Sequence, residues 1–151
     1  HGGMNVRLFP AQWAVGHTLG FEVRVRPIIR EGKTGRERDA FLAAAEKAQG
    51  SALDRGEVYV QWLREVLARK GGAELVDACM TRYQQLGVTR RSQKDNANDV
   101  RHSRLVNGPD AVLVGQLRVT DSQAFAQLLA QGVGRHRAFG FGLLLLRPAR
   151  S

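Results

Sequence analysis

The spacing of hydrophobic residues along the chain predicts where its strands and helices lie. Between residues 21 and 26 apolar and charged side chains alternate strictly, in the order Phe21, Glu22, Val23, Arg24, Val25, Arg26. Such alternation is typical of a half-buried strand, here with a basic outer face. Pro27 cannot donate to a strand ladder, so we expect the strand to end or lie at a sheet edge there.

Helical spacing follows in three segments. Residues 39–49 are rich in alanine and are followed by Gly50, and residues 57–70 repeat apolar side chains at intervals of three and four before Gly71. Residues 73–86 also predict an amphipathic helix. Its apolar face would carry Leu75, Val76, Cys79, Met80, Tyr83 and Leu86, with Cys79 buried among its neighbours.

The second half predicts mainly strands. Short strands are expected at residues 88–91 and 102–106, around a polar tip at 92–99, and a turn is expected at 107–110. A longer strand over 111–119 precedes a helix that is capped by Thr120 or Asp121 and runs to about Gln131. A glycine-rich loop and a buried strand over 141–146 complete the chain. This order predicts an α+β, ferredoxin-like (RRM-like) β-α-β-β-α-β domain with extra helices in the first crossover.

Charge adds a functional expectation to this ordinary globular composition of 43% hydrophobic and 25% charged residues. The net charge is +9, and the excess collects outside residues 39–86, which hold six Lys or Arg against seven Asp or Glu. Residues 132–151 hold four basic residues and no acidic one. A polyanionic partner is therefore expected, because neutralising phosphates releases counterions. A basic surface kept for solubility is the alternative.

Other features of the sequence narrow its class. No apolar run approaches the about 18–20 residues that span a membrane, and the N-terminus lacks the apolar centre of a signal peptide. A single cysteine excludes an internal disulfide, so we expect a cytoplasmic protein without a membrane partner. Residues 1–3, before Met4, have the composition of a tag remnant, which leaves 4–151 as the domain.

The most distinctive motif is a glycine-rich loop over residues 132–144. It contains four glycines with basic or ionisable side chains between them: Gly132, Gly134, Arg135, His136, Arg137, Gly140 and Gly142. Glycine permits positive φ, and successive N–H groups in such a loop can cradle phosphate oxygens. The loop follows a helix and opens a strand, which excludes the dinucleotide-binding fingerprint. A tight helix-to-strand turn is the alternative.

A second basic cluster flanks the polar tip at residues 92–99. It consists of Arg90, Arg91, Lys94, Arg101, His102 and Arg104. A two-stranded ribbon can enter the groove near the end of an RNA hairpin and contact phosphates on both sides. A solvated hairpin with no ligand is the alternative.

These motifs resemble the CasE family of CRISPR RNA-processing endonucleases (Cse3-like, of Cascade complexes). Residues 132–146 resemble the family's C-terminal glycine-rich loop. Weaker similarities occur in the family's order and together cover most of residues 8–148; they lie at residues 21–27, 35–39, 58–63 and 115–121. The resemblance implies the second of the family's two tandem ferredoxin-like domains.

The resemblance also implies a function. The family cuts CRISPR repeat RNA without a metal or other cofactor, by attack of a ribose 2′-hydroxyl on the scissile phosphate, and keeps the product hairpin in a Cascade-type complex. The implied partners are the repeat stem-loop and other Cascade subunits. The family's histidine acid/base lies in an N-terminal domain that no residue here matches, so the catalytic residues are unknown. That N-terminal half could lie on a separate chain.

The predicted RNA-binding residues are those of the two basic motifs. They are Gly132, Gly134, Arg135, His136, Arg137, Gly140, Gly142, Arg90, Arg91, Lys94, Arg101 and Arg104. The four histidines lack metal-ligand spacing, so we expect no metal. Two alternatives stay open: a non-catalytic Cas subunit that binds guide RNA, and an unrelated nucleic-acid-binding protein of the same fold.

Overall fold

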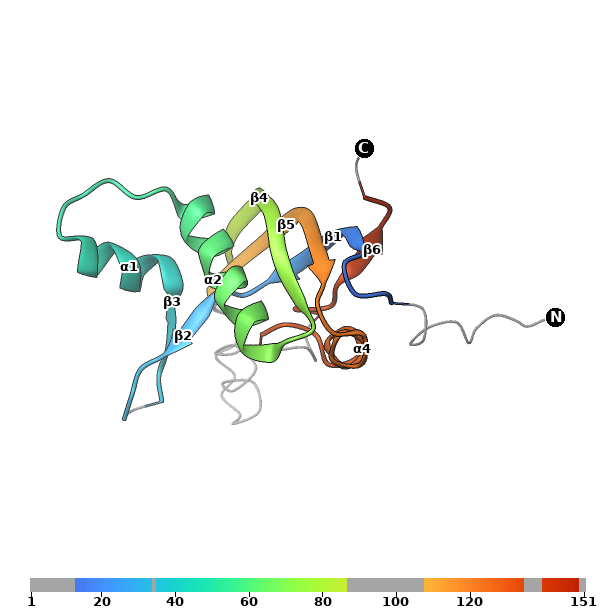
Figure 1. Ribbon diagram of the computed structural model, residues 1–151. Coiled ribbons are helices and arrows are strands. Elements are labelled where there is room, and N and C mark those ends of the chain that lie inside the picture. Colours follow the sequence, from blue (N-terminus) through green and yellow to red (C-terminus); the bar gives the residue numbers. More distant parts are fainter. Residues whose placement is uncertain (1–12, 34, 87–107, 135–139, 150–151) are drawn as a thin grey trace, which may run out of the picture.

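A four-stranded antiparallel sheet organises the part of the chain that the computed structural model describes, which is residues 13–33, 35–86, 108–134 and 140–149 (Figure 1). Its strands lie in the order β4 (Ala73–Leu86), β5 (Gly108–Val119), β1 (Thr18–Val25) and β6 (Leu145–Arg147). Strand β5 therefore lies between β1 and β4, the two strands that the first crossover connects, as in a ferredoxin-like sheet. The tag remnant expected at residues 1–3 lies outside the described residues.

Strand β1 confirms the predicted alternation. Phe21, Val23 and Val25 are at most 1% exposed, whereas Arg24 on the opposite face is exposed. Arg26 was expected on the same basic face, and this was wrong, since it is only 4% exposed. The strand ends at Val25, immediately before Arg26 and Pro27, so the alternation of the ladder does not extend to Arg26.

Strand β4 replaces the helix predicted over residues 73–86. Its pairing with β5 is interrupted by register shifts between Leu75 and Asp77 and between Met80 and Arg82. Each bulge adds one residue, so the side chains that face the core are separated alternately by two and three positions: Ala73, Leu75, Ala78, Met80 and Tyr83. That spacing imitates a helix. Cys79, expected to be buried, is exposed on the other face.

Strand β5 extends further than predicted. It begins at Gly108, so residues 108–110 belong to the strand and not to the expected turn. The short strands predicted at residues 88–91 and 102–106 lie outside the described residues. The central part of β5 is buried: Leu113, Leu117 and Val119 have no exposed surface.

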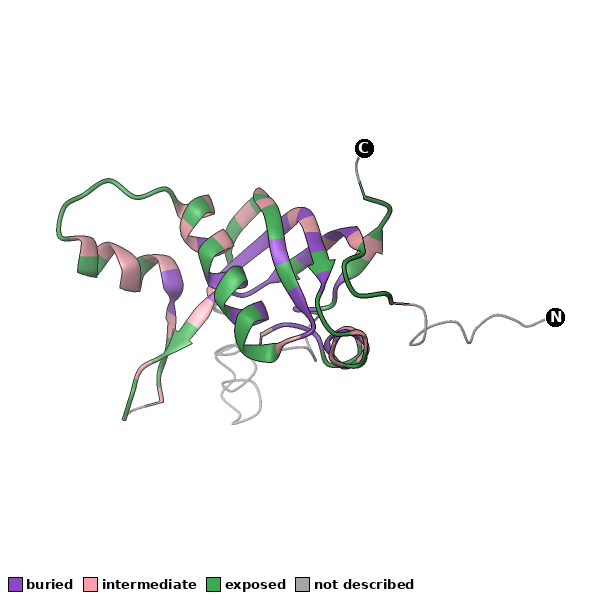
Figure 2. Ribbon diagram, viewed as in Figure 1, coloured by how far each residue is buried: buried purple, intermediate pink, exposed green. Residues whose placement is uncertain are grey.

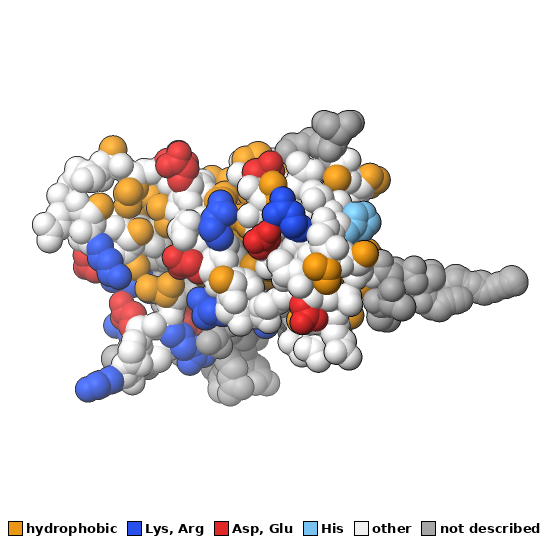
Figure 3. Space-filling model, viewed as in Figure 1, with side chains coloured by type: hydrophobic (Ala, Val, Ile, Leu, Met, Phe, Trp, Pro, Cys, Tyr) orange, Lys and Arg blue, Asp and Glu red, His pale blue; other side chains and the backbone are white. Residues whose placement is uncertain are grey.

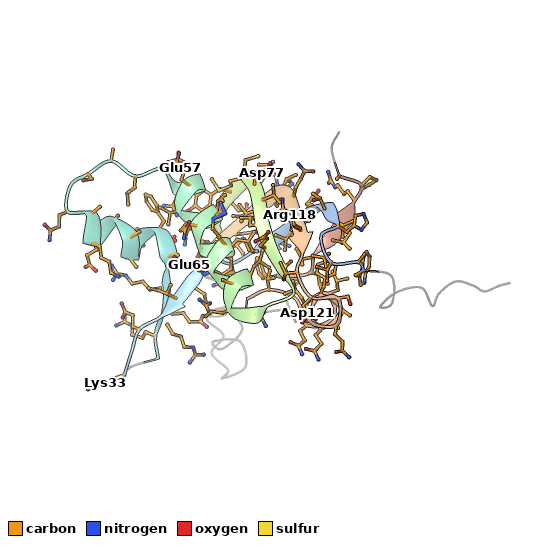
Figure 4. The ribbon with its side chains drawn as sticks, in the orientation of Figure 1. Lys33, Glu57, Glu65, Asp77, Arg118 and Asp121 are labelled. Carbon is orange, nitrogen blue, oxygen red and sulfur yellow. The ribbon has the colours of Figure 1, made fainter. Side chains whose placement is uncertain are left out.

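The first crossover contains a ribbon as well as helices. Strands β2 (Ile28–Arg30) and β3 (Glu37–Asp39) pair with each other and project from the sheet, with Lys33 at the tip (Figures 1 and 4). Helices α1 (Ala40–Ala48) and α2 (Arg55–Lys70) follow. The first crossover is therefore enlarged, as predicted, but the added elements are this ribbon and α1, where the sequence predicted helices alone. None of the helices in the described residues is long and apolar enough to cross a membrane.

Helix α4 (Ser122–Gln131) begins where it was predicted to begin. The Asp121 side chain accepts a hydrogen bond from the Ala124 N–H at 2.9 Å and caps the helix. The strand predicted over 141–146 is instead β6, which spans only Leu145–Arg147. Phe141 and Leu144 are nevertheless buried, and glycines with positive φ lie on both sides of Phe141, at Gly140 and Gly142.

The hydrophobic core lies between one face of the sheet and helices α2 and α4. Figure 2 shows the buried residues concentrated in β1, β5 and the inner side of α2. Tyr59 and Leu63 of α2, Phe125 of α4 and Phe21 of β1 are completely buried there. Ordered along the chain, β1, α2, β4, β5, α4 and β6 form the predicted β-α-β-β-α-β arrangement.

Candidate nucleic-acid interface

The two predicted RNA-binding segments begin at the same end of the sheet. Leu86, the last residue of β4, pairs with Gly108, the first residue of β5, so segment 87–107 leaves from and returns to this end. Val25, the last residue of β1, pairs with Ala111 close by. The glycine-rich loop is bonded here too, since the Gly142 N–H donates to the Arg24 carbonyl oxygen at 2.7 Å.

Arg24 connects the bases of both segments through its side chain. Its Nε and Nη2 atoms donate to the two carboxylate oxygens of Asp110 at 2.8 Å each. Its guanidinium carbon lies 4.7 Å from the centroid of the Phe141 ring. Gln84 Nε2 also donates to Asp110, at 2.9 Å. A bidentate pair and a cation–π contact thus join β1, β4, β5 and the glycine-rich loop at one point.

The electrostatics of this junction keep both partners ionised. Burial acts to raise the pKa of Asp110, but hydrogen bonds from Arg24 and Gln84 and the charge of Arg24 together hold that pKa below its ordinary value. The hydrogen bond to Asp110 raises the pKa of Arg24. Burial lowers the pKa of the neighbouring Arg26, whose guanidinium carbon lies 5.9 Å from the Phe141 centroid.

The four loop glycines have the positive φ that glycine permits. The φ angles of Gly132, Gly134, Gly140 and Gly142 are 79°, 83°, 90° and 93°. A Cβ atom at Gly142 would collide with the Val133 carbonyl oxygen, and one at Gly134 would lie 3.3 Å from the Trp62 ring. The Val133 N–H donates to the Gly142 oxygen at 2.9 Å, which closes the base of the loop.

The basic side chains that the sequence assigned to RNA belong to parts of these two segments that the structure does not describe. Arg135, His136 and Arg137 of the loop, together with Arg90, Arg91, Lys94, Arg101 and Arg104 of segment 87–107, are outside the described residues. The structure therefore brings together the ends of the segments that carry them. Their assignment to RNA stays a prediction.

A pocket beside the loop adds two basic residues that the sequence analysis missed. About 320 Å³ in volume, it is lined by Gly134, by Ile28 and Trp62, and by Arg69 and Lys70 in the last turn of α2. Both basic side chains are exposed. Basic residues are common in the last turn of a helix, where they complement the negative end of the helix dipole. The sequence near Arg69 and Lys70 therefore gives no signal that they lie beside Gly134.

On the face of the sheet opposite the core, away from the Arg24 junction, two arginines are paired with acids across the strands: Arg118 Nη1 lies 2.5 Å from Glu74 Oε2, and Arg147 pairs with Glu22. The residues that β4 and β5 place on this face include no aromatic side chain among those described, and Figure 4 shows Arg118 close to Asp77 there. The described residues of β4 and β5 therefore supply no stacking platform of the kind on which RRM-type domains bind bases.

The described residues contain no group of three or more His, Cys, Asp or Glu side chains that could hold a metal ion. His17 is exposed before β1, and its carbonyl oxygen accepts a hydrogen bond from the Val119 N–H at 2.9 Å. It therefore lies at the opposite end of β1 from Arg24, about 20 Å away at the rise of an extended strand.

A family model described as CRISPR associated protein matches residues 3–148. A comparison with curated proteins finds no match.

Among solved structures, Thermus thermophilus Cse3 bound to an RNA representing a pre-cleavage complex is 25% identical. It matches 89% of this chain and 55% of that one, with a TM-score of 0.62. CRISPR endoribonuclease Cse3 bound to a 19-nucleotide RNA is also 25% identical, over 90% of this chain and 57% of that one, with a TM-score of 0.63.

The CRISPR-associated protein Cas6e from Escherichia coli str. K-12 shares the fold. It is 22% identical over 96% of this chain and 66% of that one, with a TM-score of 0.55. The chain spans little more than half the length of the Cse3 structures that it matches.

Proposed function

Because this chain belongs to the CRISPR associated protein family, we propose that it binds the stem-loop of a CRISPR repeat RNA for metal-independent endoribonucleolytic processing. In this proposal residues 4–151 form the RNA-holding domain, and the cleaved hairpin stays bound within a Cascade-type complex with other protein subunits. The similar Cse3 structures contain RNA, which supports the choice of ligand.

The observation that carries the proposal is the junction at Arg24. It fixes the bases of segment 87–107 and of the glycine-rich loop next to each other, so the basic residues of both can reach one ligand. Arg69 and Lys70 extend the basic surface along α2 beside Gly134. An RNA stem presents phosphates on both sides of its groove, which suits a surface with several separate groups of cations.

The proposed chemistry needs proton transfer and charge stabilisation. The ribose 2′-hydroxyl forms a bond to the scissile phosphorus while the bond to the 5′-oxygen of the next nucleotide breaks, which leaves a cyclic phosphate and a 5′-hydroxyl. Arg135, Arg137 and the loop N–H groups would stabilise the charge that develops on the phosphate. Following the family resemblance, we assign the proton-transferring histidine to the family's N-terminal domain; the described His17 lies at the opposite end of β1 from the Arg24 junction.

Equilibrium binding to a repeat hairpin at two salt concentrations tests this proposal. Replacing Arg135 and Arg137 by alanine, or Arg69 and Lys70 by glutamine, should weaken binding by about tenfold or more at low salt. Each lost phosphate contact should also reduce the slope of log Kd against log salt by about one.

Arg64→Gln is the matched control. Arg64 is an exposed arginine of the same helix that lines a different pocket with Ala73, Glu74 and Leu75. Its replacement removes a positive charge from α2 and should leave affinity nearly unchanged. Equal affinity of the wild type and the Arg135/Arg137 variant at both salt concentrations would contradict the proposed role of the loop.

A further inference from the structure

An open groove with an apolar floor runs between α1 and α2. Its volume is about 410 Å³. The floor is formed by Ile29, Ala43, Ala44, Leu53, Val58 and Trp62. Figure 3 shows hydrophobic side chains gathered over α1 and α2 in this part of the molecule. Ile29 is 40% exposed and Leu53 is 37% exposed, so two large apolar side chains face the solvent here.

The groove has rigid walls. The Asp39 carboxylate accepts hydrogen bonds from Arg55 Nη1 at 2.9 Å and from the Tyr59 hydroxyl at 2.7 Å, which joins the start of α1 to α2. The Arg55 guanidinium carbon also lies 4.2 Å from the centroid of the Phe41 ring. The small side chains of Ala43 and Ala44 leave the space between these fixed helices unfilled. A ligand would therefore meet a preformed site.

The rim of the groove is acidic, although the chain as a whole carries a net charge of +9. Asp54, Glu57 and Glu65 line it, against Lys47 alone. Figure 4 shows Glu57 and Glu65 on α2. Phosphates are repelled by such a rim, which excludes RNA as the occupant. A second copy of this basic chain is disfavoured as well, because two molecules of charge +9 repel each other.

We propose that this groove docks a protein segment in which apolar side chains are flanked by Lys or Arg. The apolar side chains fill the floor, and the flanking cations face Asp54, Glu57 and Glu65. The segment belongs to a neighbouring protein subunit of the ribonucleoprotein, and in this respect the inference rests on the proposed function. The groove and the RNA surface are then separate sites with opposite charge requirements.

Binding to overlapping 18-residue peptides that tile the other proteins encoded beside this chain tests the proposal. The wild-type chain should bind at least one peptide that combines an apolar centre with basic flanks. Leu53→Ser, in the groove, should weaken that binding by about tenfold, as expected for a buried apolar anchor. Leu42→Ser is the matched control, because Leu42 is an exposed leucine of α1 that does not line the groove.

Charge reversal at the rim of the groove gives an independent test of the docking site. The double variant Glu57→Lys, Glu65→Lys should bind the same peptide at least tenfold more weakly, and a peptide with Glu in place of its basic residues should recover binding to this variant. Repeat-RNA affinity and melting temperature of Leu53→Ser should match those of the wild type, which shows that the variant is folded.

Each outcome of these binding experiments supports or contradicts the docking site. Absence of binding to every tiled peptide, or equal loss of binding in Leu53→Ser and Leu42→Ser, overturns the docking site. Self-association that Leu53→Ser abolishes would assign the groove to a second copy and also overturns the proposal. A chain that binds a peptide in the groove but fails to bind repeat RNA would refute the proposed function and leave the docking site in place.

Discussion

Gly140 and Gly142 have nearly the same φ, 90° and 93°, but very different surroundings. A Cβ atom at Gly140 would meet open space, whereas one at Gly142 would collide with the Val133 carbonyl oxygen. Gly140→Ala should therefore lower the free energy of unfolding by only about 1–2 kcal/mol, which is the cost of placing a non-glycine residue in the left-handed region. Gly142→Ala should cost about 2–4 kcal/mol, because the collision adds to the backbone strain.

Urea unfolding of the two variants measures this difference. Because both substitutions add the same methyl group at a similar φ, the gap between their unfolding free energies isolates the contact between residues 142 and 133. Equal destabilisation would show that the base of the loop is not closed by the Val133 and Gly142 backbones.

The pair of Arg24 and Asp110 also gives a prediction about pH. The Asp110 side chain is 5% exposed, whereas that of Arg24 is 43% exposed. Asp110→Asn should lower the free energy of unfolding by about 1–3 kcal/mol at neutral pH. This value is smaller than for a fully buried ion pair because the Arg24 side chain is partly exposed to solvent. The folded-state pKa of Asp110 is lowered, so its stabilising contribution is present above the unfolded pKa of about 3.9 and is lost as the pH falls through the lower folded value.

Thermal unfolding of the wild type and Asp110→Asn between pH 6 and pH 2.5 checks the sign. The difference in Tm should be constant down to about pH 4 and should narrow below it. A difference that widens on acidification would mean that the ion pair does not hold Asp110 ionised.

The same residues show what the sequence could and could not predict at this scale. Alternation placed Arg24 on the correct face, but nothing local identified Asp110, which lies 86 residues away, as its partner. Residue type permitted the positive φ of the loop glycines but did not require it, since Gly20 of β1 and Gly115 of β5 have no positive φ. The burial of Arg26 was not predictable either, because it depends on where the strand ends.

At the scale of elements, the cap at Asp121 and the end of α2 at a glycine were predicted, whereas Asp39 was placed inside its helix and α2 was expected to begin at residue 57. Asp39, Asp54 and Asp121 accept hydrogen bonds from the first turns of α1, α2 and α4, and α2 ends at Gly71 as predicted. Strand β4 was mistaken for a helix because its two bulges alter the period of the pattern. Bulges depend on the pairing of β4 with β5, which a single segment of sequence does not contain.

Gly115 of β5 gives this explanation a test. It lies opposite Ala78, between the two bulges, and a Cβ atom there would collide with the Asp77 carbonyl oxygen. Gly115→Ala should therefore disturb the pairing of β4 and cost about 2–4 kcal/mol. Urea unfolding measures the cost, and hydrogen exchange should show weaker protection in β4 than in β1. If Gly115→Ala left the free energy of unfolding unchanged, this result would contradict the close approach of β4 and β5.

For the whole molecule, the distribution of charge separates three surfaces. Arg118 and Arg147, on the sheet face opposite the core, are neutralised by Glu74 and Glu22. The groove between α1 and α2 is acidic, and the two basic side chains in the last turn of α2, Arg69 and Lys70, lie beside Gly134. The net charge of +9 suggested a polyanionic partner, but only the fold shows which surface remains suited to it.

Photo-crosslinking of a repeat hairpin to the chain, followed by mass spectrometry of the crosslinked peptides, tests the central claim most directly. The account predicts crosslinks in residues 87–107, in residues 132–142 and in the last turn of α2, all of which disappear at high salt. Crosslinks concentrated at Arg118 and Arg147, or in the groove between α1 and α2, would contradict it.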